Sequence, residues 1–201
     1  RGVNANRQQM MSEERYTEFG NEIGMRLHNV MVSSTEGLDW EDIQDRNIVS
    51  LEQLYRNNRQ AYERITEDRI DNRRLVNYMR FYKQFKDQHG YVDFTDLLEK
   101  YIADEHTEDV DVVCLDEMQD SSLLQWRLVM QAFSGASKIY IAGDDKQAVY
   151  KFQGAECEML LKLRGKQHIL DLSYRVPSKI MDFSNNIAKL IDTPYNAPCK
   201  T

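Results

Sequence analysis

Acidic and amide side chains crowd the segment CLDEMQDSS, residues 114–122, directly after the apolar run VDVVCL. Asp116, Glu117, Gln119 and Asp120 all lie within this short stretch. Carboxylate oxygens are the ligands that hard divalent cations prefer, and a carboxylate is also able to polarise a water molecule. The pattern therefore has two interpretations: an acidic surface turn, or a site for a metal ion and a nucleotide.

Two further polar clusters follow apolar runs later in the chain. Residues 144–147, Asp-Asp-Lys-Gln, come after KIYIAG, and residues 173–175, Ser-Tyr-Arg, come after HILDL. In an open parallel sheet, ligands bind beyond the carboxyl ends of the strands. Three clusters of this kind in series favour one shared site over three unrelated surface turns.

The elements that must position these clusters differ between the two parts of the chain. Residues 1 to 88 look helical, and Tyr16, Phe19, Ile23 and Leu27 are spaced like one face of a helix up to residue 27. After Gly90, apolar runs at 110–115, 138–143 and 168–172 predict buried parallel strands. Amphipathic segments at 92–102, 122–133, 155–165 and 178–191 predict helices between and around the strands. This alternation predicts an α/β sheet with crossover helices.

Composition excludes several classes of protein. Hydrophobic residues make up 41% of the 201 residues and charged residues 29%, as in an ordinary soluble globular protein. No apolar run approaches the roughly 18 residues that a membrane span needs, and no signal peptide opens the chain. The three cysteines and four histidines are scattered, which argues against a disulfide framework, a zinc site or a histidine-based metal site. A reducing compartment is therefore expected.

Charge is distributed unevenly along the chain. The net charge is −7, whereas a protein that holds nucleic acid by bulk charge is usually basic. Residues 56–86 nevertheless carry nine Lys or Arg against four acids. This stretch is either a solvated helix face or a local surface that contacts phosphates.

Four segments together resemble the UvrD/Rep-type superfamily 1 DNA helicases. VVCLDEMQD resembles their Walker B segment, commonly DExQD, and AGDDKQAVYKFQGA is similar to their GDDxQxIYxWRGA segment. LDLSYRVPSKI resembles the next segment, built around a Tyr-Arg pair, and VDFTDLL resembles a segment upstream of the Walker B strand. The resemblance extends from about Val92 to Ile187, and its specificity comes from four segments in the right order.

The resemblance implies an ATP-dependent helicase that acts on single-stranded DNA and duplex junctions, with ATP and Mg²⁺ as cofactors. Asp116 would hold Mg²⁺, and Glu117 would orient the attacking water. Gln147 would touch the γ-phosphate or the water, Arg175 would reach the γ-phosphate from a second motor domain, and Tyr174 would stack on adenine. Each residue also has an ordinary alternative: an acidic turn, a helix-capping amide, or a surface Arg beside a core Tyr. Movement in the 3′ to 5′ direction is also implied, and so is a place in the cytoplasm of a bacterial or phage-infected cell.

Aromatic residues at two positions match the family's contacts with single-stranded DNA. Tyr150 and Phe152 would stack on bases, which suits a motor because stacking tolerates any sequence. Phe152 replaces the usual tryptophan, and Gln153 stands where an arginine is common, so the role of position 153 is open. Tyr150 and Phe152 are alternatively core residues. Asp93, Phe94 and Asp96 are expected to be structural.

The phosphate-binding pattern G-x-x-x-x-G-K-[ST] is absent from these residues, and the chain begins at Arg1. We therefore expect an internal part of a longer helicase that is inactive alone and works with the remainder of that polypeptide. The expected fold is a partial RecA-like parallel sheet with flanking helices, preceded by an all-helical inserted subdomain. The expected boundaries are 1–88 for the inserted subdomain, 89–170 for the C-terminal half of the first RecA-like domain and 171–201 for the start of the second. The alternative is a non-catalytic helicase-like module that binds DNA or a protein partner.

Overall fold

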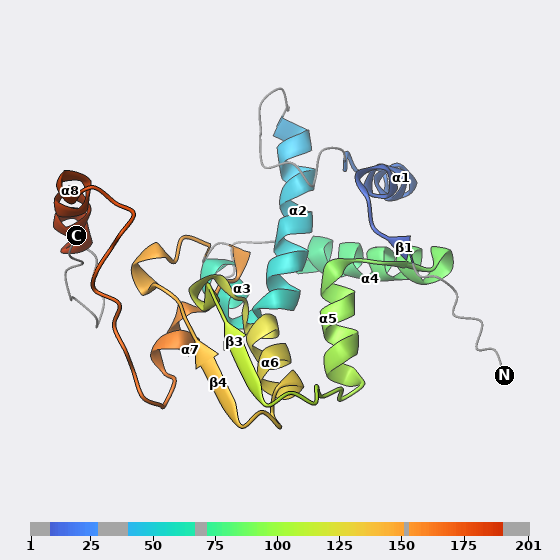
Figure 1. Ribbon diagram of the computed structural model, residues 1–201. Helices are drawn as coiled ribbons and strands as arrows, with labels where there is room; N and C mark the ends of the chain where they lie inside the picture. Colours follow the sequence, from blue (N-terminus) through green and yellow to red (C-terminus); the bar gives the residue numbers. More distant parts are fainter. Residues whose placement is uncertain (1–8, 28–39, 67–71, 151–152, 191–201) are drawn as a thin grey trace.

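A computed structural model describes residues 9–27, 40–66, 72–150 and 153–190, and within them all side chains except those of residues 40–46, 65 and 72 (Figure 1). The elements in chain order are β1 (Gln9–Met10), α1 (Glu13–Ile23), α2 (Trp40–Asn57), α3 (Arg59–Thr66), α4 (Asn72–His89), β2 (Tyr91–Val92), α5 (Phe94–Ala103), β3 (Val112–Leu115), the short 3₁₀ turn η1 (Met118–Asp120), α6 (Leu123–Ala132), β4 (Lys138–Ile141), the 3₁₀ turn η2 (Asp145–Gln147), α7 (Cys157–Leu161) and α8 (Ser178–Ala188). No helix in these ranges is long and apolar enough to cross a membrane.

Helices α1 to α4 pack around an aromatic core, which agrees with the helical character predicted for the first part of the chain. The Phe19 ring lies 5.1–5.6 Å, centroid to centroid, from the rings of Tyr78, Tyr82 and Phe85 on α4. All four side chains are almost fully buried. Aromatic pairs at these distances stabilise a core beyond the area that they bury. These contacts between α1 and α4 therefore join residues that are more than fifty positions apart in the chain.

Helix α1 ends earlier than its apolar spacing predicts. The spacing extended the helix to Leu27, but Gly24 adopts a left-handed conformation with φ 70° and ends the helix after Ile23. Glycine is the residue that most readily takes this conformation at a helix C-terminus. Leu27 is still buried, at 1% exposure, because the chain turns back onto the helical core after Gly24.

A cluster of ionised groups lies between α2, α4 and α5. The Arg56 guanidinium donates to Glu52 at 3.1 Å, Asp93 at 2.8 Å, Asp96 at 2.6 Å and Glu99 at 2.8 Å. The Lys86 ammonium donates to Asp93 and Asp96, each at 2.6 Å. These two cations come from the basic stretch 56–86, so neither is available to contact phosphate.

The same acids also start α5. Asp93 and Asp96 form a reciprocal capping box, in which each side chain accepts a hydrogen bond from the other residue's backbone N–H. A capping box satisfies N–H groups that the first turn of a helix leaves without partners. The structural role expected for Asp93 and Asp96 is therefore confirmed.

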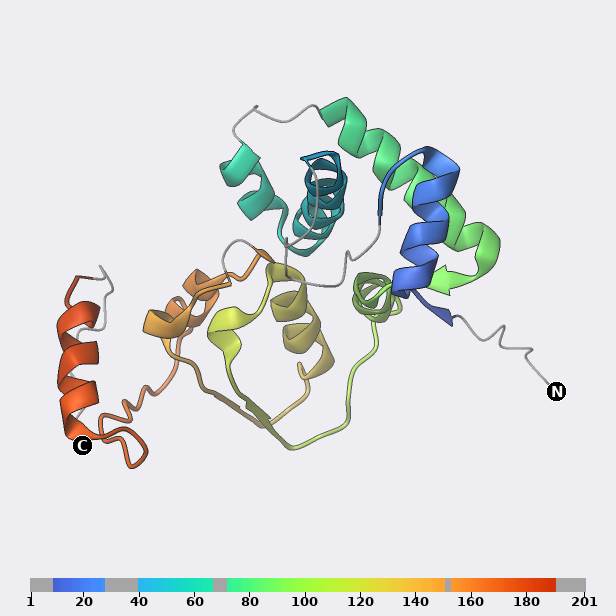
Figure 2. The ribbon, with the colours of Figure 1, turned by 90° about the horizontal axis from the view of Figure 1, so that it is seen from above.

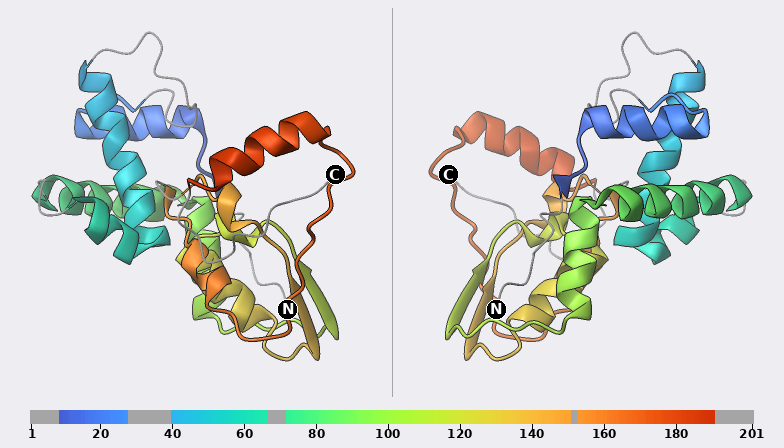
Figure 3. Two further views of the ribbon diagram at one scale, coloured as in Figure 1. Left: turned by 90° about the vertical axis from the view of Figure 1, so that its left-hand side faces the viewer. Right: turned by 90° about the vertical axis from the view of Figure 1, so that its right-hand side faces the viewer.

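Strands β3 and β4 pair in parallel, as predicted, with Leu115 beside Ile141 at their carboxyl ends. Helices α5, α6 and α7 all lie on one side of this pair, and no described element covers the other side (Figure 3). Val113 is buried against the helices, whereas Val112 and Tyr140 are more than half exposed. The prediction that both strands are buried was therefore wrong, because helices cover only one face.

Residues 168–172 do not form the predicted third strand, and Leu170 is 83% exposed. A strand requires a neighbour that pairs with it along its length, whereas in this run only Leu172 forms an isolated β-bridge. The segment belongs instead to an extended arm that leads from α7 to α8. Helix α8, which was predicted correctly, has no buried residue and lies apart from the rest of the described chain (Figures 1 and 2).

Candidate functional site

Two polar turns meet at the carboxyl ends of β3 and β4. Parallel pairing sets Leu115 beside Ile141, so the residues after each strand leave the sheet at the same edge. Backbone hydrogen bonds continue this pairing beyond the strands: Ala142 N–H donates to Leu115 O at 2.8 Å, and Met118 N–H donates to Ala142 O at 3.1 Å. The first two clusters predicted from the sequence are therefore neighbours in space.

The turn after β3 presents two exposed carboxylates. Asp116 Oδ1 accepts a hydrogen bond from the Glu117 N–H at 2.9 Å. Glu117 has φ 55°, in the left-handed region that residues other than glycine seldom enter. Backbone of this kind costs on the order of 1–3 kcal/mol and tends to occur at functional sites. The strained turn directs Asp116 and Glu117 outward at the end of the strand.

Gln119 connects the two turns. Its side chain is 1% exposed, its Nε2 donates to Glu117 Oε2 at 2.6 Å, and its Oε1 accepts from the Asp144 N–H at 3.0 Å. Asp144 Oδ2 in turn accepts from Gln147 Nε2 at 2.6 Å. A continuous chain of hydrogen bonds thus joins Glu117 to Gln147, and we call these four residues the Glu117–Gln147 chain.

The close fit of Gln119 depends on a glycine at position 143. A Cβ atom at Gly143 would lie 2.7 Å from Gln119 Oε1 and 2.8 Å from Leu160 Cδ2. These separations are too short for a carbon atom to fit without movement of its neighbours. The sequence analysis names Gln119 but assigns it no role. The feature of the sequence that could have indicated a role is an amide placed among three carboxylates.

Side chains with oxygen atoms suited to a hard divalent cation follow both strands at this edge. Besides the exposed carboxylates of Asp116 and Glu117, Asp145 Oδ2 and Asp120 Oδ1 are buried and accept no hydrogen bond from another described residue. Mg²⁺ is usually bound by one or two carboxylates, while waters and substrate phosphates complete its coordination. The donors present therefore fit Mg²⁺ at Asp116, together with a phosphate-bearing substrate.

Of the two aromatic residues predicted to contact DNA, Tyr150 lies within the described residues. Tyr150 follows η2 and is 44% exposed, so it is not the core residue of the alternative interpretation. Phe152 lies outside the described residues. Gln153, which replaces a cation of the family pattern, is exposed and donates its N–H to Tyr150 O at 2.9 Å.

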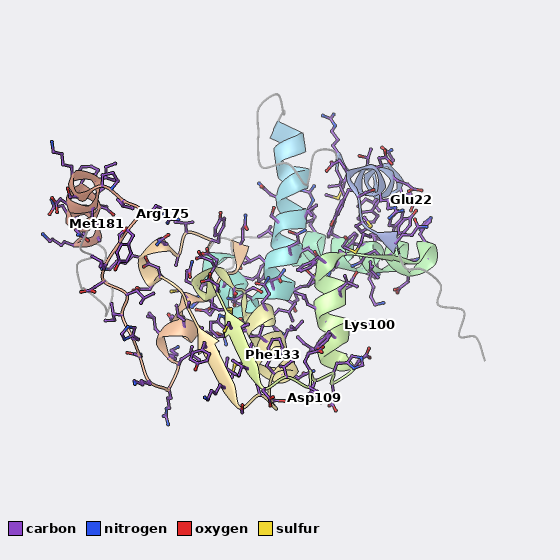
Figure 4. All side chains as sticks on the ribbon, viewed as in Figure 1. Glu22, Lys100, Asp109, Phe133, Arg175 and Met181 are labelled. Atoms are coloured by element: carbon purple, nitrogen blue, oxygen red, sulfur yellow. The ribbon has the colours of Figure 1, made fainter. Side chains whose placement is uncertain are left out.

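The third polar cluster does not join the first two. Tyr174 is 93% exposed, and the Arg175 guanidinium makes no hydrogen bond or ion pair with another described residue. Arg175 lies beside α8, at a distance from β3 and β4 (Figure 4). Both residues lie on the exposed arm between α7 and α8, so their roles at the strand ends stay predictions.

Comparison with known proteins identifies similarity over most of the chain. The family model of the UvrD/REP helicase N-terminal domain matches residues 4–168. The RecBCD enzyme subunit RecB of Mycolicibacterium smegmatis is 34% identical over 74 residues, which are 35% of this chain and 7% of that protein. DNA helicase II of Salmonella typhimurium is 30% identical over 118 residues, 52% of this chain and 16% of that protein. The probable DNA helicase II homolog of Mycoplasma pneumoniae is 24% identical over 136 residues, 60% of this chain and 19% of that protein. The chain thus matches less than a fifth of the length of each of these relatives.

Proposed function

Because the chain belongs to the UvrD/REP helicase family, we propose that it forms part of the motor of an ATP-dependent DNA helicase that moves along single-stranded DNA. The observation that carries this proposal is the Glu117–Gln147 chain at the carboxyl ends of β3 and β4. It joins a carboxylate able to polarise water to an amide able to sense a phosphate, and both stand beside an Mg²⁺-compatible carboxylate. Hydrolysis of a nucleoside triphosphate requires these groups together.

Each group has a distinct part in hydrolysis. Mg²⁺ bound at Asp116 would neutralise charge on the β- and γ-phosphates. Glu117 would orient and polarise the attacking water, and the Gln119 amide would hold the Glu117 carboxylate in place. Gln147 would contact the γ-phosphate or the water without adding charge.

Tyr174 and Arg175 would complete the site from the second motor domain. Tyr174 would stack on adenine, and the Arg175 guanidinium would bind the γ-phosphate in its forked geometry. Their position on the arm between α7 and α8 supports a site that forms only when that second domain closes on the first. The arm would then move relative to β3 and β4.

The helical core of α1 to α4 supports a division of the chain into the three expected parts. Residues 1–88 would be the helical subdomain inserted into the first motor domain. Residues 89–170 would be the C-terminal half of that RecA-like domain, and residues 171–201 would begin the second. Tyr150 and Phe152 would stack on the bases of single-stranded DNA near a duplex junction. Because the named relatives are bacterial, we place this activity in the cytoplasm of a bacterial or phage-infected cell.

A non-catalytic module that keeps the fold without the motor has less support. Two of the relatives are helicases by name, and Asp116, Glu117, Gln147 and Arg175 all match groups needed for one reaction. A module that only bound DNA would not need a hydrogen-bonded water-activating group at the end of β3.

The proposal is tested by measuring ATP hydrolysis by the natural full-length protein, with Mg²⁺ or EDTA and with or without single-stranded DNA. We expect hydrolysis that requires Mg²⁺ and is stimulated by the DNA. Hydrolysis that is absent, or that does not respond to DNA, would contradict the proposal. Residues 1–201 alone are expected to be inactive, and DNA-stimulated turnover by that chain would overturn this part.

A further inference from the structure

The segment that follows Gln147 is fastened at its far end by a residue of the helical core. Asn58 Nδ2 donates to Gly154 O and to Glu156 Oε2, both at 3.0 Å. Asn58 lies between α2 and α3 and is 1% exposed. The two bonds span more than ninety residues of sequence, so no local pattern in the sequence indicates them.

Both polar atoms of the Asn58 side-chain amide make hydrogen bonds. Besides the two bonds from Nδ2, its Oδ1 accepts from the Ala61 N–H at 3.0 Å and so caps α3. Gly154, with φ 96°, packs against the same residue, because a Cβ atom there would lie 3.3 Å from Asn58 Cβ. A side chain held from both ends has one orientation, which makes it a rigid anchor for residues 154–156.

The anchored residues contact both functional turns. Glu156 N–H donates to Ser121 O at 2.9 Å, next to η1, and Ala155 pairs with Ser122. Ala155 N–H and Gln153 N–H donate to Tyr150 O at 3.2 Å and 2.9 Å. A path of hydrogen bonds therefore runs from Asn58 to the backbone of Tyr150 on one side and to the turn that holds Gln119 on the other.

Arg64 supports this anchor without duplicating it. Its guanidinium donates to Glu156 Oε2 at 3.0 Å, but its side chain is 57% exposed, whereas that of Glu156 is 11% exposed. Loss of Asn58 would leave Gly154 O buried without its donor and Glu156 with only the exposed partner. An unsatisfied buried acceptor is costly, so the segment would shift towards another arrangement.

We propose that Asn58 is a positioning residue, through which the helical core fixes the segment carrying Gln147 and Tyr150 and so couples contact with single-stranded DNA to ATP hydrolysis. This inference rests on the proposed function. In this role Asn58 touches neither ATP nor DNA. It acts by holding the backbone that places the amide of Gln147 and the ring of Tyr150.

Two variants and a matched control test the proposal in the full-length protein. Asn58→Ala removes the anchor and the cap of α3. Asn58→Asp keeps an oxygen that caps α3 but sets a carboxylate against Gly154 O and Glu156. Arg59→Ala, at the next position, removes the exposed ion pair with Glu63 and the contact of the guanidinium with the Tyr55 ring, but leaves the bonds of Asn58 in place. A defect that both Asn58 variants share and that Arg59→Ala lacks is caused by loss of the anchor and not by a general change in α3.

The first readout is hydrogen exchange at the amides of Gln153, Ala155 and Glu156, which needs no enzymatic activity. We expect exchange to become at least about tenfold faster in both Asn58 variants and to stay unchanged in Arg59→Ala. Unchanged exchange in the Asn58 variants overturns the anchor.

The second readout is the ratio of kcat with single-stranded DNA to kcat without it. We expect this ratio to fall about tenfold in both Asn58 variants, because misplacement of a positioned group by a fraction of an ångström slows catalysis. A purely structural role would lower both rates alike and leave the ratio unchanged, and that result overturns the coupling. Absence of DNA-stimulated hydrolysis in the wild-type protein would instead refute the proposed function, and hydrogen exchange would still decide on the anchor.

Discussion

Gln119 and Asp144, which follow different strands, are joined by a hydrogen bond of 3.0 Å from the Asp144 N–H to Gln119 Oε1. Together with the bond from the Met118 N–H to Ala142 O, this contact ties the turn after β3 to the turn after β4. Because Gln119 also donates to Glu117, a movement of either turn changes the environment of the proposed water-activating carboxylate. The site is therefore one hydrogen-bonded unit and not two adjacent loops.

Substitution of Gln119 by methionine should separate the two turns. Gln119→Met keeps the length of the side chain but leaves the Asp144 N–H and the Glu117 carboxylate without a partner. We expect a loss of about 1–3 kcal/mol in the free energy of unfolding, measured with urea. Gln84→Met, at an exposed position on α4, is the control and should change little. Equal stability of the two variants would show that Gln119 does not join the turns.

Addition of one methyl group at Gly143 should disturb the same contact from the other side. The new Cβ of Gly143→Ala would press on Gln119 Oε1 and Leu160, and we expect unfolding to become easier by about 1–3 kcal/mol. DNA-stimulated ATP hydrolysis should fall as well. Gly135→Ala is the matched control, because a Cβ there meets no atom within 4 Å. If both alanine variants behave alike, Gly143 is not closely packed against Gln119.

Stability of the helical core should depend on pH through Glu52. Burial raises the pKa of Glu52 from 4.5 to about 7, against the opposing effect of Arg56. Between these two values the folded protein keeps a proton that the unfolded chain has lost, so the free energy of unfolding falls as pH rises. The loss between pH 5 and 8 should be on the order of 3 kcal/mol.

Urea unfolding of residues 1–201 between pH 5 and 8 measures this dependence. Glu52→Gln should remove the loss, whereas Glu63→Gln, at an exposed site on α3, should keep it. Asp93 does not contribute to the change in the free energy of unfolding between pH 5 and 8. Burial opposes its ionisation, but Arg56 and Lys86 outweigh burial and hold the pKa of Asp93 below 3.8, so its contribution is lost only at lower pH. The same pH dependence in wild type and Glu52→Gln would refute this origin.

Local features of the structure could be predicted from the sequence. Helices α5, α6 and α8, the parallel strands β3 and β4, and the strand-end positions of Asp116, Glu117 and Gln147 all follow from apolar spacing and from the residues after each run. Spacing carries this information because it reports which faces of an element meet the core.

Features that depend on distant contacts could not be predicted. The apolar run 168–172 looked like a strand, but a strand forms only where a neighbour pairs with it. The bonds of Gln119 to Asp144 and of Asn58 to Gly154 depend on strand register and helix packing, which no local pattern records. The charge pattern of residues 56–86 likewise did not indicate that Arg56 and Lys86 would form ion pairs with the acidic side chains around α5.

The role of Glu117 in activating water is tested by the turnover number for DNA-stimulated ATP hydrolysis by the Glu117→Gln variant of the full-length protein. The amide keeps the shape of the side chain but is a poor acceptor of the water's proton, so kcat should fall at least about 100-fold while ATP still binds. Asp109→Asn, at an exposed acid near the opposite end of β3, is the control and should retain wild-type turnover (Figure 4). Wild-type turnover by Glu117→Gln would show that the carboxylate after β3 does not activate water.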